Sequence, residues 1–424
     1  MLSGIRVVSF THFLQGPSAT QMLADLGAEV VKIESPAGAF ERSWSGPDAY
    51  VGDASVFFLL GNRNVQSLSI DLKSEKAKSI LLKLIDDADV LIESFRPGAL
   101  ERLGFGYEEL SARNPRLVYC SLSGYGSAGP YRDRPGQDLL LQSLSGLAHA
   151  TGSADSPPTS VGASVIDQHG AVLGAFGILG ALLGRERTGK GCKVESNLLN
   201  AALDLQIEPI SYYLNGFRGE RSSTGIGSRY YKAPYGIYRT ADGHITVSIT
   251  ALSILSEAFD DNWFTTIAAD DEYNRREEIN ERISKHLAER TTQEWEAHFT
   301  EHKVWFAPRQ RLRSRRQRCP GAAQQQLPRV RLPRQRPGQG ARSPDPLRRP
   351  DTGRPYAASR PGRTHRVHLE HTRAQRQRDR RTHTGRSCPC PQRLRKSSSH
   401  WKPVRAWPPS PSTGRKSSTP SIRR

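Results

Sequence analysis

The sequence predicts a doubly wound α/β fold, in which a parallel sheet carries helices on both faces. From residue 4 to residue 126, short apolar runs alternate with helical stretches, and this alternation is typical of α/β proteins. The first unit is a strand–helix–strand segment of about 30 residues, which requires parallel strands joined by a right-handed crossover. We therefore expect a large Rossmann-like domain.

The elements of this domain follow from local signals. The run GIRVVSF, residues 4–10, is typical of a buried strand. A helix is expected over 16–28, because Pro17 suits a first helical turn and Gly27 suits a C-terminal stop. Further strands are expected at 29–34, 67–72, 89–95 and 117–126, with an amphipathic helix at 74–88.

A smaller α+β domain is predicted next. The stretch YGIYRTADGHITVSIT, residues 235–250, has the pattern of a hairpin with ADG as its turn. Helical stretches follow at 251–261, 275–290 and 291–302. We expect domains at 1–225 and 226–308, followed by a tail at 309–424.

The tail carries all the excess positive charge of the chain. The net charge is +19, but residues 309–424 hold 32 Lys and Arg against 4 Asp and Glu, whereas residues 1–308 are mildly acidic. The tail contains 16 prolines and only 10 residues of Ile, Leu, Val and Phe. Such a segment buries too little apolar surface to offset its backbone entropy, so we expect disorder.

Three interpretations of the tail stay open: an arm that binds RNA or membranes, a neutral linker, or out-of-frame translation of GC-rich DNA. We favour the frameshift, because the composition breaks inside a helix–loop pattern that proceeds normally up to VWFAP. We accordingly expect no specific nucleic-acid or membrane partner.

Composition and motifs narrow the function classes. Two cysteines before the tail, with no signal-peptide pattern, favour a reducing, cytoplasmic location. The longest uncharged apolar run, 171–184, is too short to span about 30 Å of hydrocarbon. Neither GxGxxG nor GxxxxGK[ST] is present, and we identify no metal-ligand spacing, so no metal and no permanent cofactor is expected. His12 and His169 stand alone.

Asp167 is the one carboxylate at the start of SVIDQHGAVLGAFGILGALLGRERTGKG, residues 164–191, which is otherwise apolar, rich in small residues and closed by a basic turn. From these residues alone, Asp167 is either a helix N-cap or a nucleophile.

Five blocks carry a resemblance that favours the nucleophile. They are GPSATQMLADLGAEVVKIE, NRNVQSLSIDLKS, ADVLIESFRPGALERLGFGYEEL, NPRLVYCSLSGYGSAGPYRDRPGQDLLLQSLSG and GILGALLGRERTGKGCKVESNLLNAAL. Together, over residues 2 to 307, they resemble the family III CoA-transferases of the CaiB/BaiF type, which include formyl-CoA transferase, carnitine CoA-transferases and α-methylacyl-CoA racemases. The tail from Arg309 does not match.

The resemblance implies a CoA-transferase with Asp167 as nucleophile, just before a small-residue helix. Its carboxylate would attack an acyl-CoA thioester, giving a mixed anhydride, and CoA thiolate would then form an aspartyl-CoA thioester. The acceptor carboxylic acid would reverse these steps. Acyl-CoA is thus expected as substrate, and backbone N–H groups should stabilise the oxyanions.

The resemblance also implies the CoA contacts. Backbone amides near Leu14 and Gln15 are expected to meet phosphate at a helix N-terminus. The other implied contacts are Ser35, Ile70, Asp71, Leu72, Lys73, Ser94, Phe95, Arg96, Arg102, Gly136, Gln137 and Asp138.

Two of these positions depart from the family pattern. Ser35 stands where relatives often have arginine, so one phosphate contact is in doubt. Gln137 stands where the racemases have a catalytic histidine. Glutamine cannot exchange the α-proton, so the alternative function, racemisation, is disfavoured. Three roles stay open for Asp138: it orients the acyl group, it controls hydrolysis of the anhydride, or it is a plain loop residue.

The resemblance further implies an interlocked homodimer, in which the chain after the small domain returns to complete the large one. The tail offers no such segment, so the chain is alternatively an inactive, disrupted copy, and we expect poor solubility or loss of the native dimer. The acid substrate cannot be assigned from the sequence.

Overall fold

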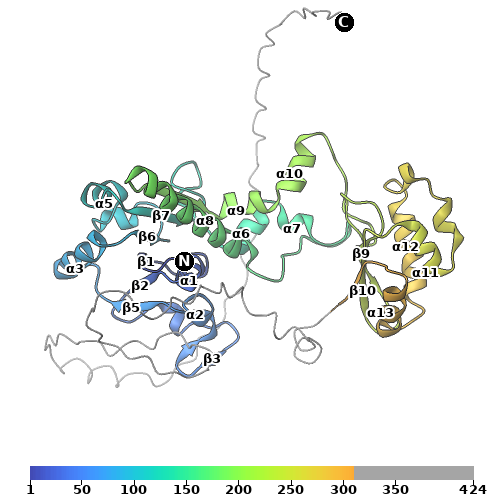
Figure 1. The fold of residues 1–424 in the computed structure, drawn as a ribbon, viewed down its shortest axis with the longest axis horizontal. Helices are drawn as coiled ribbons and strands as arrows, with labels where there is room; N and C mark the ends of the chain where they lie inside the picture. Colours follow the sequence, from blue (N-terminus) through green and yellow to red (C-terminus); the bar gives the residue numbers. More distant parts are fainter. Residues whose placement is uncertain (310–424) are drawn as a thin grey trace, which may run out of the picture. The chain divides into compact units, whose positions relative to one another are not determined.

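The computed structural model describes residues 1–309, so our expectation of disorder after residue 309 lies outside the described residues (Figure 1). Its main sheet is six-stranded, with the order β5-β2-β1-β6-β7-β8, and every neighbouring pair is parallel. The prediction of a doubly wound parallel sheet is therefore confirmed. The strands are β1 (Arg6–Phe10), β2 (Glu29–Glu34), β5 (Gln66–Ser69), β6 (Val90–Glu93), β7 (Val118–Ser123) and β8 (Lys193–Asn197).

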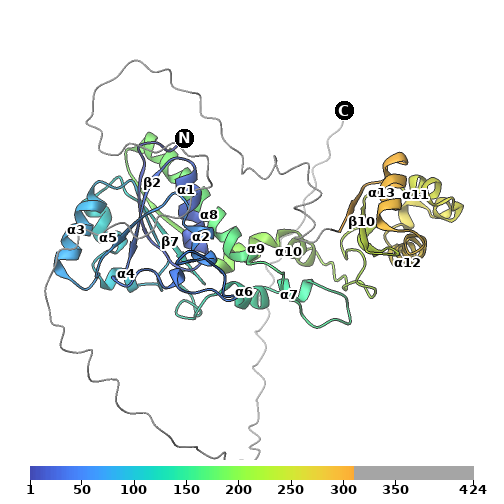
Figure 2. The same cartoon turned by 90° about the horizontal axis from the view of Figure 1, so that it is seen from below.

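Helices cover both faces of this sheet (Figure 2). On one face, α1 (Gln15–Asp25) and α8 (Val165–Thr188) pack against inward-facing strand residues such as Val7 and Leu122. On the other face, residues of α3 (Glu75–Asp86), α4 (Ala99–Arg102) and α5 (Tyr107–Arg113) form a second core with Val8 and Tyr119. Alternate strand residues thus point into two different cores, which explains why the central strand β6, VLIE, is buried along its whole length.

Small residues let α8 lie close to the sheet and to α1. A Cβ on Gly174 would come within 2.9 Å of the Leu122 side chain, and one on Gly170 within 2.6 Å of Nε2 of Gln15. The small-residue stretch noted in the sequence is therefore a packing surface, and it fixes the position of Asp167 relative to α1.

Helix α8 is longer than the apolar run 171–184 identified in the sequence. It has 24 residues, and by length and composition alone it is the one helix within residues 1–309 that could cross a membrane. One side of it packs on the sheet, as in a core helix, while Val172, Phe176 and Leu183 remain exposed.

Further short elements complete this part of the chain. Helices α6, α7 and α9 and the start of α8 build a separate small core around Leu141 and Ile166, α10 follows α9 along the chain, and η1 and α2 lie near β3 and β4. Their bounds are η1 (Phe40–Arg42), β3 (Tyr50–Val51), β4 (Ala54–Ser55), α2 (Val56–Gly61), α6 (Asp138–Leu144), α7 (Leu147–Ala150), α9 (Leu198–Leu205) and α10 (Ile207–Leu214).

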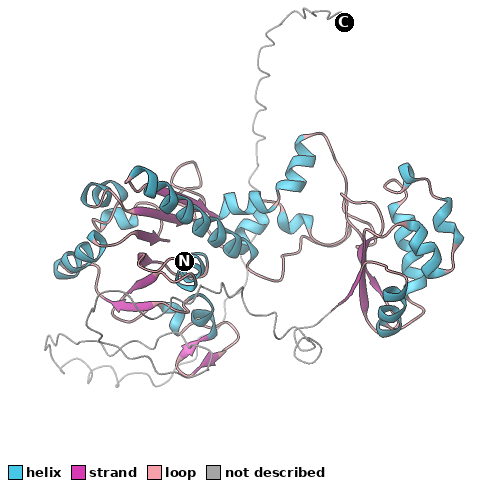
Figure 3. Ribbon diagram, in the orientation of Figure 1, coloured by secondary structure: helices cyan, strands magenta, loops and turns pink. Residues whose placement is uncertain are grey.

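A second sheet, with its own core, follows along the chain (Figure 3). It is antiparallel with the order β11-β10-β9, so the predicted hairpin is confirmed. The remaining elements are β9 (Tyr235–Arg239), β10 (His244–Ser248), α11 (Leu252–Phe259), η2 (Asn262–Thr266), η3 (Ala269–Asp271), α12 (Arg276–Leu287), α13 (Thr292–Glu301) and β11 (Phe306–Pro308). The division at residue 225 stays a prediction.

Some predicted boundaries need correction. The strand expected at 67–72 ends at Ser69, because the chain turns there and the amide of Lys73 donates to the Asp71 side chain. The helix expected from residue 16 begins at Gln15, so Pro17 is its third residue. Asp167 lies inside the first turn of α8 and not before the helix, because α8 already begins at Val165.

Candidate active site

The residues predicted to bind CoA follow the carboxyl ends of the parallel strands. Leu14 and Gln15 come after β1, Ser94–Arg96 after β6, and Gly136–Asp138 in the loop between β7 and α6. The strand order reverses between β1 and β6, and ligands of doubly wound sheets bind at such a switch point. The fold therefore gathers these segments at the edge where a nucleotide-containing ligand is expected.

Asp167 is the third residue of α8 and is partly buried. The helix N-cap is Ser164, and no side chain of α8 caps its first turn. The simple N-cap interpretation of Asp167 is therefore wrong.

Asp138 takes the capping role instead. Its Oδ2 accepts the backbone N–H groups of Ile166, at 2.8 Å, and of Asp167, at 3.0 Å. Asp138 is itself buried, at 5% exposure, and is the first residue of α6. Of the alternatives left open for it, a plain loop residue is excluded, because it joins the starts of two helices.

Gln142, one helical turn after Asp138, was missed from the sequence. Its Nε2 donates to Oδ1 of Asp138 at 2.5 Å, and its Oε1 accepts the amide of Val161 at 2.8 Å. Gln142 thereby holds both Asp138 and the loop that leads into α8. The i, i+4 spacing of the two residues on α6 was the signal that could have identified this pair.

Burial and, to a smaller extent, the negative charge of Asp138 together raise the pKa of Asp167 from 3.8 to about 7. The two helical amides that would favour the ionised form of Asp167 are occupied by Asp138. A carboxylate with a high pKa is a stronger nucleophile once deprotonated, and at neutral pH a large fraction of it is deprotonated.

Gln15 lies close to the first turns of α8. Its side chain is buried at 7% exposure, it contacts Gly170, and its Nε2 has no hydrogen-bond partner. A second contact between the helices runs from Nε2 of Gln168 to the hydroxyl of Ser18, at 3.2 Å. Gln15 therefore offers an unused N–H donor one helical turn from Asp167.

The loops after β1 and β6 contact one another. The hydroxyl of Ser94 accepts the backbone N–H of His12 at 3.1 Å, and the rings of His12 and Phe95 lie 5.4 Å apart. A Cβ on Gly16 would come within 3.1 Å of the Ser94 hydroxyl. His12 and Gly16, on either side of Leu14 and Gln15, therefore bring this loop against Ser94 and Phe95.

The other predicted contacts lie further along the same sheet edge. The Ser35 hydroxyl donates to the carbonyl of Gly38 at 2.7 Å, and its own carbonyl accepts from Ser69. Asp71 and Lys73 are exposed, whereas Ile70 and Leu72 pack against the second core. Arg102 ends α4 and is exposed beside Gly98.

Gly136 positions Asp138 through a close backbone contact. A Cβ on Gly136 would come within 2.4 Å of the Cα of Gly124, which follows β7. Only glycine fits at both positions. Gln137 is exposed and is the N-cap of α6, where its side chain makes no capping hydrogen bond.

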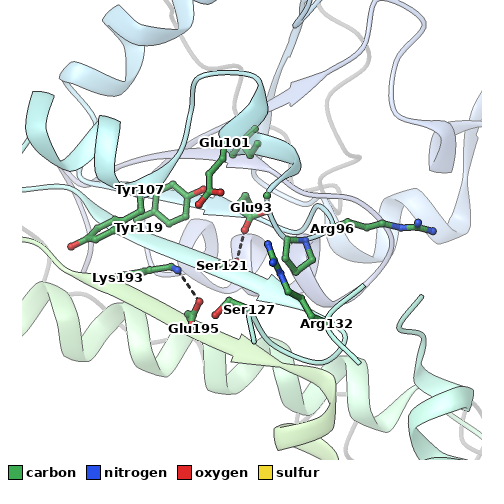
Figure 4. A pocket seen from close by; sticks show the side chains of 13 residues that line it. Glu93, Arg96, Glu101, Tyr107, Tyr119, Ser121, Ser127, Arg132, Lys193 and Glu195 are labelled. Atoms are coloured by element: carbon green, nitrogen blue, oxygen red, sulfur yellow. Dashed lines mark hydrogen bonds and ion pairs between the residues drawn. The ribbon is translucent and has the colours of Figure 1, made fainter. Parts of the chain in front are cut away.

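A cavity of about 190 Å³ lies on the face of the sheet opposite α8, and of the predicted residues it includes only Arg96 (Figure 4). Glu93 lies in it and hydrogen-bonds Ser121, while Lys193 pairs with Glu195 at 2.8 Å. Burial raises the pKa of Glu93 to about 7 despite that hydrogen bond. Asp167 does not line this cavity.

The fold and the site define a class: a doubly wound α/β protein with a buried carboxylate, Asp138, and a partly buried one, Asp167, after the carboxyl ends of its parallel strands. The family model of CoA-transferase family III matches residues 2–352. The chain belongs to this family. The match continues past residue 307, where we expected the resemblance to end.

Several characterised proteins are similar to the chain. It is 42% identical to acetyl-CoA:oxalate CoA-transferase of Acetobacter aceti over 242 residues, covering 56% of this chain and 61% of that protein. It is 33% identical to succinyl-CoA:glutarate CoA-transferase of Mus musculus over 318 residues, covering 72% of this chain and 71% of that protein. The crystal structure of Rv3272 from Mycobacterium tuberculosis superimposes with a TM-score of 0.66 at 30% identity, covering 76% of this chain and 86% of that protein. The chain thus spans less than two thirds of the first of these relatives.

Proposed function

We propose that the chain moves CoA from an acyl-CoA thioester to a carboxylic acid through a covalent intermediate on Asp167. The observation that carries the proposal is the position of Asp167: partly buried in the first turn of α8, with its pKa raised to about 7 and the neighbouring amides taken by Asp138. Membership of CoA-transferase family III supports the reaction class.

In the first step, an oxygen of Asp167 attacks the thioester carbonyl carbon, and the C–S bond breaks to give an acyl-aspartyl anhydride and CoA thiolate. The thiolate then attacks the aspartyl carbonyl carbon, which releases the donor acid as its carboxylate and leaves Asp167 as a CoA thioester. An acceptor carboxylate reverses the two steps and leaves as the new acyl-CoA. No proton or electron is gained or lost overall.

Each attack passes through an oxyanion, which needs hydrogen-bond donors. The unpartnered Nε2 of Gln15, next to Gly170, supplies a donor near the first turn of α8. Asp138 orients this turn through two amide hydrogen bonds, and its charge keeps Asp167 reactive. The amide of Gln137 can act neither as a general acid nor as a general base, which disfavours racemisation of an α-carbon.

The assembly and location remain proposals of the same kind. The family favours an interlocked homodimer, but the tail offers no segment that completes it, so we propose that the exposed apolar side chains of α8 cause self-association in place of the native dimer. A cytoplasmic location is supported by Cys120 and Cys192, which are both free thiols.

The test is mass spectrometry of the full chain after incubation with acetyl-CoA and oxalate, or with succinyl-CoA and glutarate. We expect a CoA adduct on the peptide that contains Asp167, removed by hydroxylamine as the aspartyl hydroxamate. Asp167→Ala should abolish the adduct and the transfer, while Asp155→Ala, at an exposed loop position, should keep both. Transfer by Asp167→Ala would overturn the proposal, and a folded wild-type chain without adduct would indicate the inactive, disrupted copy.

A further inference from the structure

Three polar side chains meet where α13 ends. His298, Glu301 and His302 follow one another at i, i+3 and i+4, so they share one side of the helix. One ring nitrogen of each histidine and one carboxylate oxygen of Glu301 all lie within 4.8 Å of one another. Within residues 1–309, this is the one group of three potential ligands so placed.

The hydrogen bonds of the two histidines define which nitrogen carries the proton. Nε2 of His298 lies 2.6 Å from the carbonyl oxygen of Ala258, and Nδ1 of His302 lies 2.9 Å from the carbonyl oxygen of His298. A carbonyl oxygen only accepts, so both of these nitrogens must donate. In the neutral rings, Nδ1 of His298 and Nε2 of His302 therefore keep their lone pairs.

This arrangement is the one that metal-binding histidines adopt. Each ring uses one nitrogen to donate to a backbone carbonyl, which fixes the ring and leaves the other nitrogen as a ligand. Two histidines at i and i+4 on one helix face chelate zinc in other folds. We propose that His298, Glu301 and His302 bind a divalent transition metal ion, with Zn²⁺ preferred over Mg²⁺ and Ca²⁺ because two of the three ligands are imidazoles.

The ligands must close slightly around the ion. Tetrahedral Zn²⁺ with bonds of 2.0–2.2 Å needs its ligand atoms about 3.4 Å apart. Glu301 is exposed and can rotate inward, and His302, the C-cap of α13, can tilt about its Nδ1 hydrogen bond. His298 is held by Ala258 and by ring contacts with Trp295 and Phe299, and it provides the fixed side of the site.

The location gives the ion a structural role. After His302 the chain reverses through Lys303, whose φ is +57°, and continues into β11. His298 also ties α13 to the last turn of α11 through Ala258. A bound ion would therefore fasten the end of α13 at the point where β11 begins. This site differs from the expectation of no metal, although HFTEH, residues 298–302, stands in the sequence with two histidines at i and i+4.

The experiment is modification of the full chain by diethyl pyrocarbonate with and without about 50 µM ZnCl₂. A histidine that is bound to Zn²⁺ reacts more slowly, and the extent of binding depends on the zinc concentration by mass action. Peptide mapping then reports each histidine separately, so zinc bound by the tail cannot mimic the result. We expect Zn²⁺ to slow modification of His302 about tenfold or more, and to leave the exposed His149 on α7 unchanged. MgCl₂ at the same concentration should protect neither.

A variant separates chelation from simple burial. Glu301→Gln removes the anionic ligand at an exposed position and should not affect folding, and it should raise the zinc concentration needed for half-protection about tenfold. Equal modification of His302 with and without Zn²⁺ in the wild-type chain would overturn the proposal. Unchanged protection in Glu301→Gln would also overturn it as a three-ligand site.

Discussion

Replacing Asp138 with asparagine should move the pH dependence of aspartyl-CoA formation to lower pH. On the proposed mechanism only the ionised form of Asp167 attacks the thioester, so the rate should rise with pH and level off above the pKa of Asp167, at about 7. Asparagine keeps one side-chain oxygen to accept the amides of Ile166 and Asp167, but it removes the negative charge and the second oxygen, which accepts from Gln142.

The size of the change follows from the two causes of the raised pKa. The pKa rises from 3.8 to about 7, burial is the larger cause, and the charge of Asp138 is the second. The charge therefore accounts for less than half of the rise. We expect the midpoint of the curve of adduct formation rate against pH to fall from about pH 7 to no lower than about pH 5.5. This shift corresponds to a Coulomb energy between Asp138 and ionised Asp167 of at most about 2 kcal/mol.

The assay is rapid quenching of the full chain with excess acetyl-CoA between about pH 5 and about pH 8.5, with the adduct on Asp167 quantified by mass spectrometry. In the wild type, the rate should fall about tenfold for each pH unit below the midpoint. Asp138→Asn should be faster than the wild type below about pH 6 and slower on the plateau, because a carboxylate of lower pKa is a weaker nucleophile. Asp155→Asn is the matched control and should follow the wild-type curve.

The reasoning fails if Asp138→Asn forms the adduct with the wild-type midpoint, because the charge of Asp138 would then have no influence on Asp167. It also fails if the wild-type rate does not change between about pH 5.5 and about pH 8, because Asp167 would then not titrate in this range. Loss of the adduct at all pH values in a folded variant would show that hydrogen bonding by Asp138, and not its charge, is what matters.

Three further predictions concern stability and assembly. Asp167→Asn should have a higher free energy of unfolding in urea at pH 8 than the wild type, by at most about 4 kcal/mol. The reason is that the raised pKa of Asp167 makes the wild-type folded state less stable as the pH rises from 3.8 through about 7, and Asp155→Asn should show no such gain. Gly136→Ala should lose about 1–3 kcal/mol, because its Cβ would meet the Cα of Gly124, whereas Gly162→Ala, which has no neighbour within 4 Å, should be near neutral. The full chain should self-associate, and Phe176→Asp, at 74% exposure on α8, should reduce light scattering; a well-behaved dimer of the unmodified chain would contradict this expectation.

The sheet could be predicted because its signals are local. Runs such as EVVKIE are buried on both sides and bounded by turn residues, so their pattern defines strands, and parallel pairing follows from the crossover rule. Short helices such as α5, and the exact end of β5, were not predicted, because a few turns or pairs depend on tertiary packing more than on local sequence.

The candidate site was predictable only in part. Asp167 and Gln15 were identified, yet their surroundings depend on residues distant in sequence: Asp138 reaches α8 across 29 positions, and Gly170 meets Gln15 through helix packing. The i, i+4 spacing of Asp138 and Gln142 could have identified them as a pair, but the sequence alone does not predict that Asp138 caps another helix. Similarly, the free nitrogens of His298 and His302 follow from contacts with carbonyls, which spacing alone does not supply.

The interpretations of Asp167 as a cap and as a nucleophile exclude each other on energetic grounds. A carboxylate that accepts the free amides of a helix N-terminus is stabilised in its ionised form, so its pKa falls and its reactivity falls with it. At the start of α8, Asp138 accepts these amides, and Asp167 is left partly buried without them. The same hydrogen bonds that stabilise the helix therefore place a second negative charge next to Asp167 and raise its pKa. In the proposed mechanism two aspartates divide roles that one could not combine, and this division is the strongest physical reason to propose Asp167 for the covalent step.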